Sequence, residues 1–160
     1  HMRTGDVAGF GAFNGHSGLL SVTKKADGHY LTVTSTTVNF KNDSKIIDSV
    51  DEEVMRSIKL PADVNSIYLR INADFRVGRD IARFAYSTDG IDWTDTGDEF
   101  KMRFDYRRLF MGTRFAIYNY ATEAPGGYID VDRFDYRRVP NTVSDMAGEL
   151  TNMNHTGIFR

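Results

Sequence analysis

The chain has 160 residues, of which 41% are hydrophobic and 26% charged, a composition typical of one globular domain. Its 20 basic and 22 acidic residues give a formal net charge of −2, and no long run of one sign occurs. This balance argues against electrostatic capture of nucleic acid or of an anionic membrane. The absence of cysteine excludes disulfides, a cysteine-ligated zinc site and a thiol nucleophile.

The two ends of the chain differ in character from its middle. We interpret His1 and Met2 as a remnant of an expression vector and expect residues 3–139 to form the domain. Residues 140–160 lack a period and are expected to be a tail or linker, unless residues 157–160 supply an edge strand. No charged-then-apolar leader and no run of about 18 apolar residues occurs. The compartment stays undecided between secretion and the bacterial cytoplasm.

Apolar and polar residues alternate along most of the chain, as they do in strands with one buried face. "AGFGAFNG", residues 8–15, is typical of a strand and a turn, and the polar stretch 39–49 of a loop. Alternation predicts further strands at residues 30–34, 66–77, 114–118 and 128–132. Asp-Gly and Gly-Gly turns separate them. Short strands with frequent turns predict an all-β antiparallel sandwich or barrel.

The stretch "YSTDGIDWT", residues 86–94, resembles the Asp-box hairpin of sialidases and other carbohydrate-active β proteins. In such a hairpin Asp89 and Gly90 form the turn, and Trp93 folds back over it. We favour a structural role for this hairpin. An exposed Trp93 that stacks on a sugar is the alternative.

Asp130 and Asp132 stand two residues apart on a predicted strand, so their backbones lie about 6.6 Å apart on one face. Glycoside hydrolysis uses paired carboxylates at a similar separation. Surface charge, or a ligand position of a structural calcium, is the interpretation that we prefer. A calcium held mainly by backbone carbonyls would leave no motif, so the sequence neither predicts nor excludes one.

The stretch "FMGTRFAIYNYATEAPGGYIDVDRFDY", residues 110–136, contains seven aromatic residues around an Ala-Pro-Gly-Gly turn. If Phe115 and Ile117 face inward, then Arg114, Tyr118 and Tyr120 share the other face. Tyr128 with the two aspartates could adjoin them. Rings beside planar donors and acceptors are typical of a sugar-binding surface. A sandwich face covered by a partner domain would have the same composition.

These segments together resemble the C-terminal β-sandwich domain of glycoside hydrolase family 43 enzymes, the β-xylosidases and α-arabinofuranosidases. The resemblance covers residues 5–136. Its most specific parts are the Tyr-Ser-x-Asp-Gly-x-x-Trp hairpin, Lys101-Met102-Arg103, Gly112-x-Arg114-Phe115, Asn119-Tyr120-Ala121-Thr122 and Gly126-Gly127-Tyr128 before Asp130.

The resemblance implies a concanavalin A-like jelly-roll sandwich that accompanies a five-bladed propeller, where the catalytic carboxylates reside. It therefore implies no glycosidase activity for this chain, and Asp130 and Asp132 lose their catalytic candidacy. Phe110 matches a phenylalanine that helps to wall the substrate pocket in such enzymes. Members of this domain family have also been regarded as xylan-binding modules.

We therefore predict a non-catalytic accessory module that binds xylan or arabinoxylan and associates with a family 43 catalytic domain. The alternative is a domain that shapes the pocket of such a propeller without binding sugar alone. A glycosidase that uses the two aspartates is the least favoured hypothesis. The predicted sugar contacts are the rings of Trp93, Phe110, Tyr118 and Tyr120, with Tyr68, Arg70 and Arg114 as polar partners; Asp130 and Asp132 are the weak metal candidates.

Overall fold

The computed structural model describes residues 1–42, 44–76, 78–103, 112–139 and 154–159. For residues 139 and 154–159 it describes the backbone alone. Within these ranges no helix is long and apolar enough to cross a membrane.

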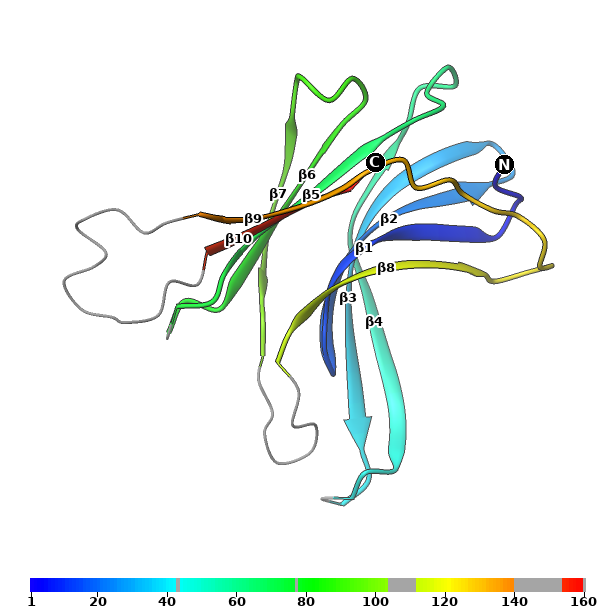
Figure 1. Ribbon diagram of the computed structural model, residues 1–160. Helices are drawn as coiled ribbons and strands as arrows, with labels where there is room; N and C mark the ends of the chain where they lie inside the picture. Colours follow the sequence, from blue (N-terminus) through cyan, green and yellow to red (C-terminus); the bar gives the residue numbers. More distant parts are fainter. Residues whose placement is uncertain (43, 77, 104–111, 140–153, 160) are drawn as a thin grey trace.

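In the described residues, ten antiparallel strands form two five-stranded sheets that pack face to face (Figure 1). The first sheet has the order β4-β3-β2-β1-β8, and the second has the order β7-β6-β5-β10-β9. The strands of the first sheet are β1 (Asp6–Phe13), β2 (His16–Lys25), β3 (Gly28–Phe40), β4 (Ile47–Lys59) and β8 (Arg114–Ala121). Those of the second are β5 (Tyr68–Asp74), β6 (Ile81–Ser87), β7 (Thr94–Lys101), β9 (Phe134–Val139) and β10 (Asn154–Phe159). The predicted all-β antiparallel sandwich is confirmed.

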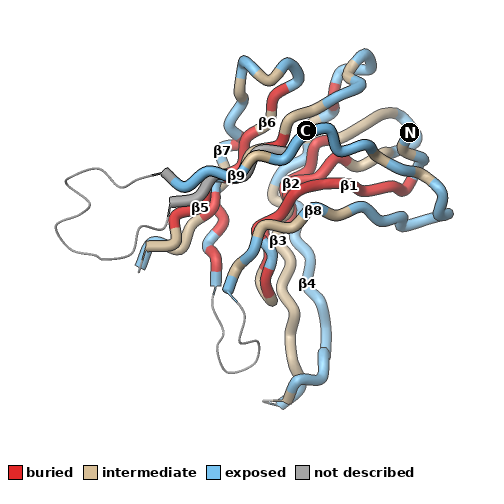
Figure 2. The backbone as a smooth tube through the Cα atoms, in the orientation of Figure 1, coloured by how far each residue is buried: buried red, intermediate tan, exposed pale blue. Residues whose placement is uncertain are grey.

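The core lies between the two sheets, where alternate side chains from both inner faces meet. Figure 2 shows buried residues along strands of both sheets. Phe10 and Leu20 come from the first sheet, and Ile71 and Phe84 from the second; all four are fully buried. Gly18 lets the sheets approach here, because a Cβ at this position would lie 2.6 Å from the ring of Phe100. Apolar residues therefore alternate along the strands because one face of each sheet packs into this core.

Two predicted segments differ from the structure. β4 was not predicted, since this edge strand is exposed on almost every residue and shows no clear alternation. Residues 128–132, predicted as a strand, have no strand pairing. The reason is topological: β8 ends at the edge of the first sheet and β9 begins at the edge of the second. The connection between them must cross from one sheet to the other, and it leaves the ladders while it does so.

The two ends of the chain contribute more than predicted. We expected residues 157–160 to form at most an edge strand, but β10 pairs with β5 on one side and β9 on the other, which makes it an interior strand. Sequence reasoning missed this position because β10 joins strands that are distant in the chain. At the other end, Met2 packs against the core, and the ring of His1 stacks on Tyr128 at 4.5 Å. Both residues that we had set apart therefore contact the sandwich.

Candidate functional site

The structure divides the predicted sugar contacts between two surfaces on different sheets. Arg114, Tyr118 and Tyr120 belong to β8 of the first sheet, whereas Tyr68 and Arg70 belong to β5 of the second, near Trp93. Phe110 lies outside the described residues. No single site therefore brings all of the predicted residues together.

Tyr118 lies on the face of the first sheet that points away from the core. It pairs in register with Gly9 of β1, and its hydroxyl lies 2.6 Å from the Ser21 hydroxyl on β2. A Cβ on Gly9 would stand 2.7 Å from the tyrosine oxygen, and one on Gly11 would stand 3.4 Å from the ring. The two glycines thus leave the space in which the ring lies against the sheet. Burial is the main reason that the pKa of Tyr118 is raised.

Tyr120 extends this aromatic surface toward solvent. Its ring stacks beside that of Tyr118, with centroids 6.2 Å apart and an interplanar angle of 30°. Its exposed fraction is 47%, so much of the ring is available for contact. We call the surface formed by Tyr118, Tyr120, Gly9, Gly11 and Ser21 the tyrosine face.

Glu52 lies near the tyrosine face, although it belongs to β4, at the opposite edge of the first sheet. After burial, this carboxylate is a cause of the raised pKa of both Tyr118 and Tyr120. Glu52 pairs in register with Thr36 of β3, and the Tyr118 hydroxyl reaches Ser21 of β2. The Tyr118 and Glu52 side chains therefore extend toward each other across the outer side of the sheet.

Short polar side chains form the floor of the outer face beside the two tyrosines. Ser21, Thr32 and Thr34 alternate with the core residues of β2 and β3, so they point to the outer side, yet they are almost fully buried. Short side chains on an outer face become buried where the sheet curves inward. We infer from this burial that the outer face of the first sheet is concave. Arg114 also points to this side by its register with Phe13, but it lies four residues from Tyr118, about 13 Å along the strand. A ligand would have to extend along β8 to contact both.

The second surface is centred on Trp93, at the end of the β6–β7 hairpin. Asp89 accepts hydrogen bonds from the backbone N–H groups of Ile91 and Asp92 and from the Ser87 hydroxyl. These bonds lower the pKa of Asp89, because they favour its charged form. Gly90 has a positive φ of 78°, as the turn requires. The predicted Asp and Gly turn is therefore present.

Trp93 folds back onto β5 rather than standing free. The guanidinium carbon of Arg70 lies 3.4 Å from the centre of the indole ring, and the Tyr68 ring meets the indole edge-to-face at 6.4 Å. A Cβ on Gly90 would lie 2.8 Å from the Tyr68 ring, so the turn rests on this tyrosine. All three side chains are partly exposed. We call them the Arg-Trp cluster.

Asp130 and Asp132 line a cavity of about 490 Å³ at one end of the sandwich, between the sheets. Core residues such as Val22 and Leu69 form its inner wall, with His29 also in the lining. The structure does not bring these aspartates beside the tyrosine face, because the cavity that they line lies on the core side of the first sheet. Among the described residues, no group of three or more His, Cys, Asp or Glu side chains could hold a metal ion.

Sequence reasoning missed Glu52 and the glycine pair of β1. Glu52 lies 66 residues before Tyr118, and no local pattern connects them. The glycines did leave a signal, since Gly9 and Gly11 alternate with Phe10 and Ala12 on a predicted strand. A strand with glycine on one face is a place where another group approaches closely.

Two stacked antiparallel sheets, one with a concave outer face, define a β-sandwich of the jelly-roll type. Residues 1–137 match the family model described as the beta xylosidase C-terminal concanavalin A-like domain. The chain belongs to this family, which confirms the resemblance and the concanavalin A-like class of the sandwich.

Solved structures agree with this assignment. A bifunctional GH43-CE protein of Bacteroides eggerthii is 30% identical with a TM-score of 0.62, over 79% of this chain and 14% of that chain. A GH43 glycoside hydrolase, engineered to display endo-xylanase and exo-arabinofuranosidase activity, is 22% identical with a TM-score of 0.67 and shares the fold; 99% of this chain and 26% of that chain are covered. The chain thus spans about a quarter or less of these proteins. A search of the curated proteins found no match.

Proposed function

We propose that this domain is a non-catalytic module that binds xylan or arabinoxylan on the tyrosine face. The observation that carries the proposal is the pair of stacked rings, Tyr118 and Tyr120, on a concave face with a polar floor. Sugar rings present flat C–H surfaces that pack on aromatic faces, and their hydroxyls need nearby hydrogen-bonding groups.

Each part of the tyrosine face has a distinct role in this proposal. Tyr118 is fixed by Ser21 and by the space above Gly9, so it supplies a rigid base at little entropic cost. Tyr120 supplies the exposed ring on which a sugar stacks. Glu52, on the opposite wall, accepts hydrogen bonds from sugar hydroxyls. Arg114 contacts a more distant sugar unit of an extended chain.

Affinity electrophoresis in gels that contain xylan, arabinoxylan or mixed-linkage glucan tests this proposal. We expect the xylan gels to retard the wild-type chain, and Tyr120→Ala to weaken the apparent affinity about fivefold. This factor corresponds to about 1 kcal/mol for a lost stacking ring. Tyr136→Ala is the matched control, since Tyr136 is 53% exposed but lies on β9 of the second sheet. Equal retardation in gels with and without glycan would refute binding by the isolated domain.

An alternative function is to pack on a family 43 catalytic domain and shape its pocket without binding sugar alone. The observation that favours it is an apolar strip where the edge strands β8 and β9 meet. Phe115 contacts Tyr136 edge-to-face at 6.1 Å, and Phe134 meets the core residue Phe10 at 5.8 Å. Ile117, Phe134 and Tyr136 are all more than two-fifths exposed. An exposed strip of this kind is typical of a contact surface. This alternative predicts no retardation by any glycan.

A further inference from the structure

Arg70 is a cation without a described counter-ion. It forms no ion pair with any carboxylate in the described ranges, and its Nε is buried without a hydrogen-bond partner. Burial alone lowers the pKa of this guanidinium, with no acidic neighbour to oppose the shift. Two nearby arginines are paired: Arg76, just after β5, contacts Asp74 at 2.7 Å, and Arg83 on β6 contacts Glu99. Arg70 is therefore held by packing on the Trp93 indole and not by a charge.

We propose that the Arg-Trp cluster is a second binding site, which takes the carboxylate of an acidic sugar, a uronate unit carried by a polysaccharide. This site goes beyond the proposed function and is independent of it, because the tyrosine face belongs to the other sheet.

The geometry of the cluster favours a carboxylate on a ring-shaped ligand. The buried Nε cannot reach a ligand, so the terminal nitrogens of Arg70 are the available donors, and a guanidinium binds the two oxygens of a carboxylate in one plane. The rings of Tyr68 and Trp93 provide apolar walls beside this charge. A sugar carboxylate joins a planar anion to a flat C–H surface and so matches both features.

The site is also organised before any ligand arrives. Hydrogen bonds from the Ser87 hydroxyl and from backbone N–H groups to Asp89 fix the hairpin, and Tyr68 supports the turn at Gly90. The indole and the guanidinium therefore need little rearrangement on binding, which reduces the entropic cost.

The test uses the fluorescence of Trp93, which is the only tryptophan of the chain. The wild-type chain is titrated with a glucuronic acid-bearing xylo-oligosaccharide and with the same oligosaccharide after reduction of its carboxyl group to an alcohol. We expect a saturable change with the acidic form and at least tenfold weaker binding of the reduced form. Sodium acetate at the same concentrations should have no effect, since it lacks the sugar ring.

Three variants distinguish the two proposals. Arg70→Gln should abolish the response, and Arg70→Lys should weaken it, because an ammonium cannot bind both oxygens in one plane. Tyr120→Ala should leave the response of Trp93 unchanged, whatever its effect on xylan retardation. Equal binding of the acidic and reduced forms by the wild-type chain would overturn the proposal, and this outcome does not depend on how any variant folds. An equal response to acetate would overturn the assignment to a sugar.

Discussion

The contact between Gly9 and Tyr118 couples the stability of the domain to its candidate binding face. In β1, Phe10 and Ala12 fill the core while Gly9 and Gly11 leave the outer side open. The tyrosine occupies that opening and is held by Ser21. One face of β1 therefore packs in the core, and its other face contacts the Tyr118 ring.

Replacement of Gly9 by alanine should disturb both functions of β1. The new Cβ would lie 2.4 Å from the Leu20 carbonyl oxygen and 2.7 Å from the Tyr118 hydroxyl, so backbone and ring would have to move. We expect a loss of about 1–3 kcal/mol in the free energy of unfolding, measured by urea denaturation. Gly112→Ala is the control, because no atom of the described residues lies within 4 Å of its added Cβ. Equal stability of both variants would contradict this account.

The strand β10 completes the second sheet from the far end of the chain. Its residues pair with β5 through Asn154↔Asp74 to Phe159↔Leu69, and with β9 on the other side. Without it, β5 and β9 would each expose an unpaired edge, which invites aggregation. The last described residues of the chain are thus part of the sandwich.

A proline in β10 should weaken the whole sheet. Thr156→Pro removes a backbone N–H, so the carbonyl that accepts its hydrogen bond loses its partner. On an interior strand, water cannot replace that partner. We expect a cost of about 1–3 kcal/mol, the penalty of an unsatisfied buried backbone group, seen as a lower thermal midpoint by circular dichroism. Thr156→Val keeps the N–H and should unfold close to the wild-type temperature. If both variants unfold alike, β10 does not belong to the ladder.

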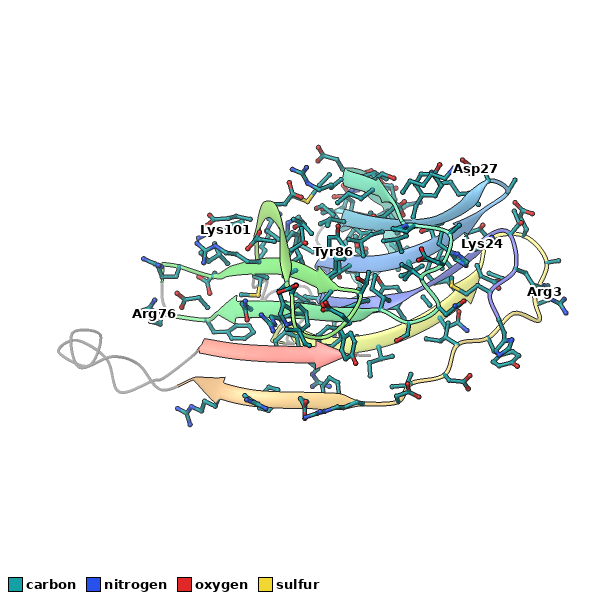
Figure 3. The ribbon with its side chains drawn as sticks, turned by 90° about the horizontal axis from the view of Figure 1, so that it is seen from above. Arg3, Lys24, Asp27, Arg76, Tyr86 and Lys101 are labelled. Carbon is teal, nitrogen blue, oxygen red and sulfur yellow. The ribbon has the colours of Figure 1, made fainter. Side chains whose placement is uncertain are left out.

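Charged groups secure the two ends of the sandwich, as seen from above in Figure 3. At the β2–β3 turn, Asp27 accepts hydrogen bonds from Lys59 and from the Tyr30 hydroxyl, both at 2.7 Å. The bond from Lys59 is the main reason that the pKa of Asp27 is lowered to about 2. At the opposite end, the hydrogen bond from Arg76 is the main reason that the pKa of Asp74 is lowered. Both carboxylates are therefore favoured in their charged form by the fold.

These shifts predict that the domain loses stability in acid. A carboxyl group whose pKa is lowered in the folded state stabilises the fold above its unfolded pKa, about 3.9 for aspartate. That contribution is lost as the pH falls through the window between about 4 and the folded pKa, about 2 for Asp27. The thermal midpoint should therefore decrease between pH 6 and pH 2.5.

Asp27→Asn and Asp74→Asn should each lower the thermal midpoint at pH 6. Each should also make the thermal midpoint fall less steeply between pH 6 and pH 2.5. The effect should be smaller for Asp27, because solvent screens exposed ion pairs. Asp63→Asn is the control, since its carboxylate forms no ion pair in the described ranges. A decline as steep in the double variant Asp27→Asn/Asp74→Asn as in the wild type would exclude these two groups as its cause.

Local sequence patterns were sufficient for the fold class and for single elements. Alternation with a period of two shows which side of a strand is buried, and it can be recognised from neighbouring residues alone. The strands β1, β5 and β8 could therefore be predicted. The Asp89-Gly90 turn is likewise encoded within a few residues, because its hydrogen bonds are local. The shared face of Arg114, Tyr118 and Tyr120 follows from alternation along one strand.

Contacts between distant parts of the chain required the folded structure. The position of β10 between β5 and β9, the crossing at residues 128–132, and the approach of Glu52 to Tyr120 all depend on strand order and sheet curvature. For the same reason, the sequence could not show that Trp93 and Tyr120 occupy different sheets. Alternation assigns a side chain to a face, but strand pairing across the whole chain determines which faces meet.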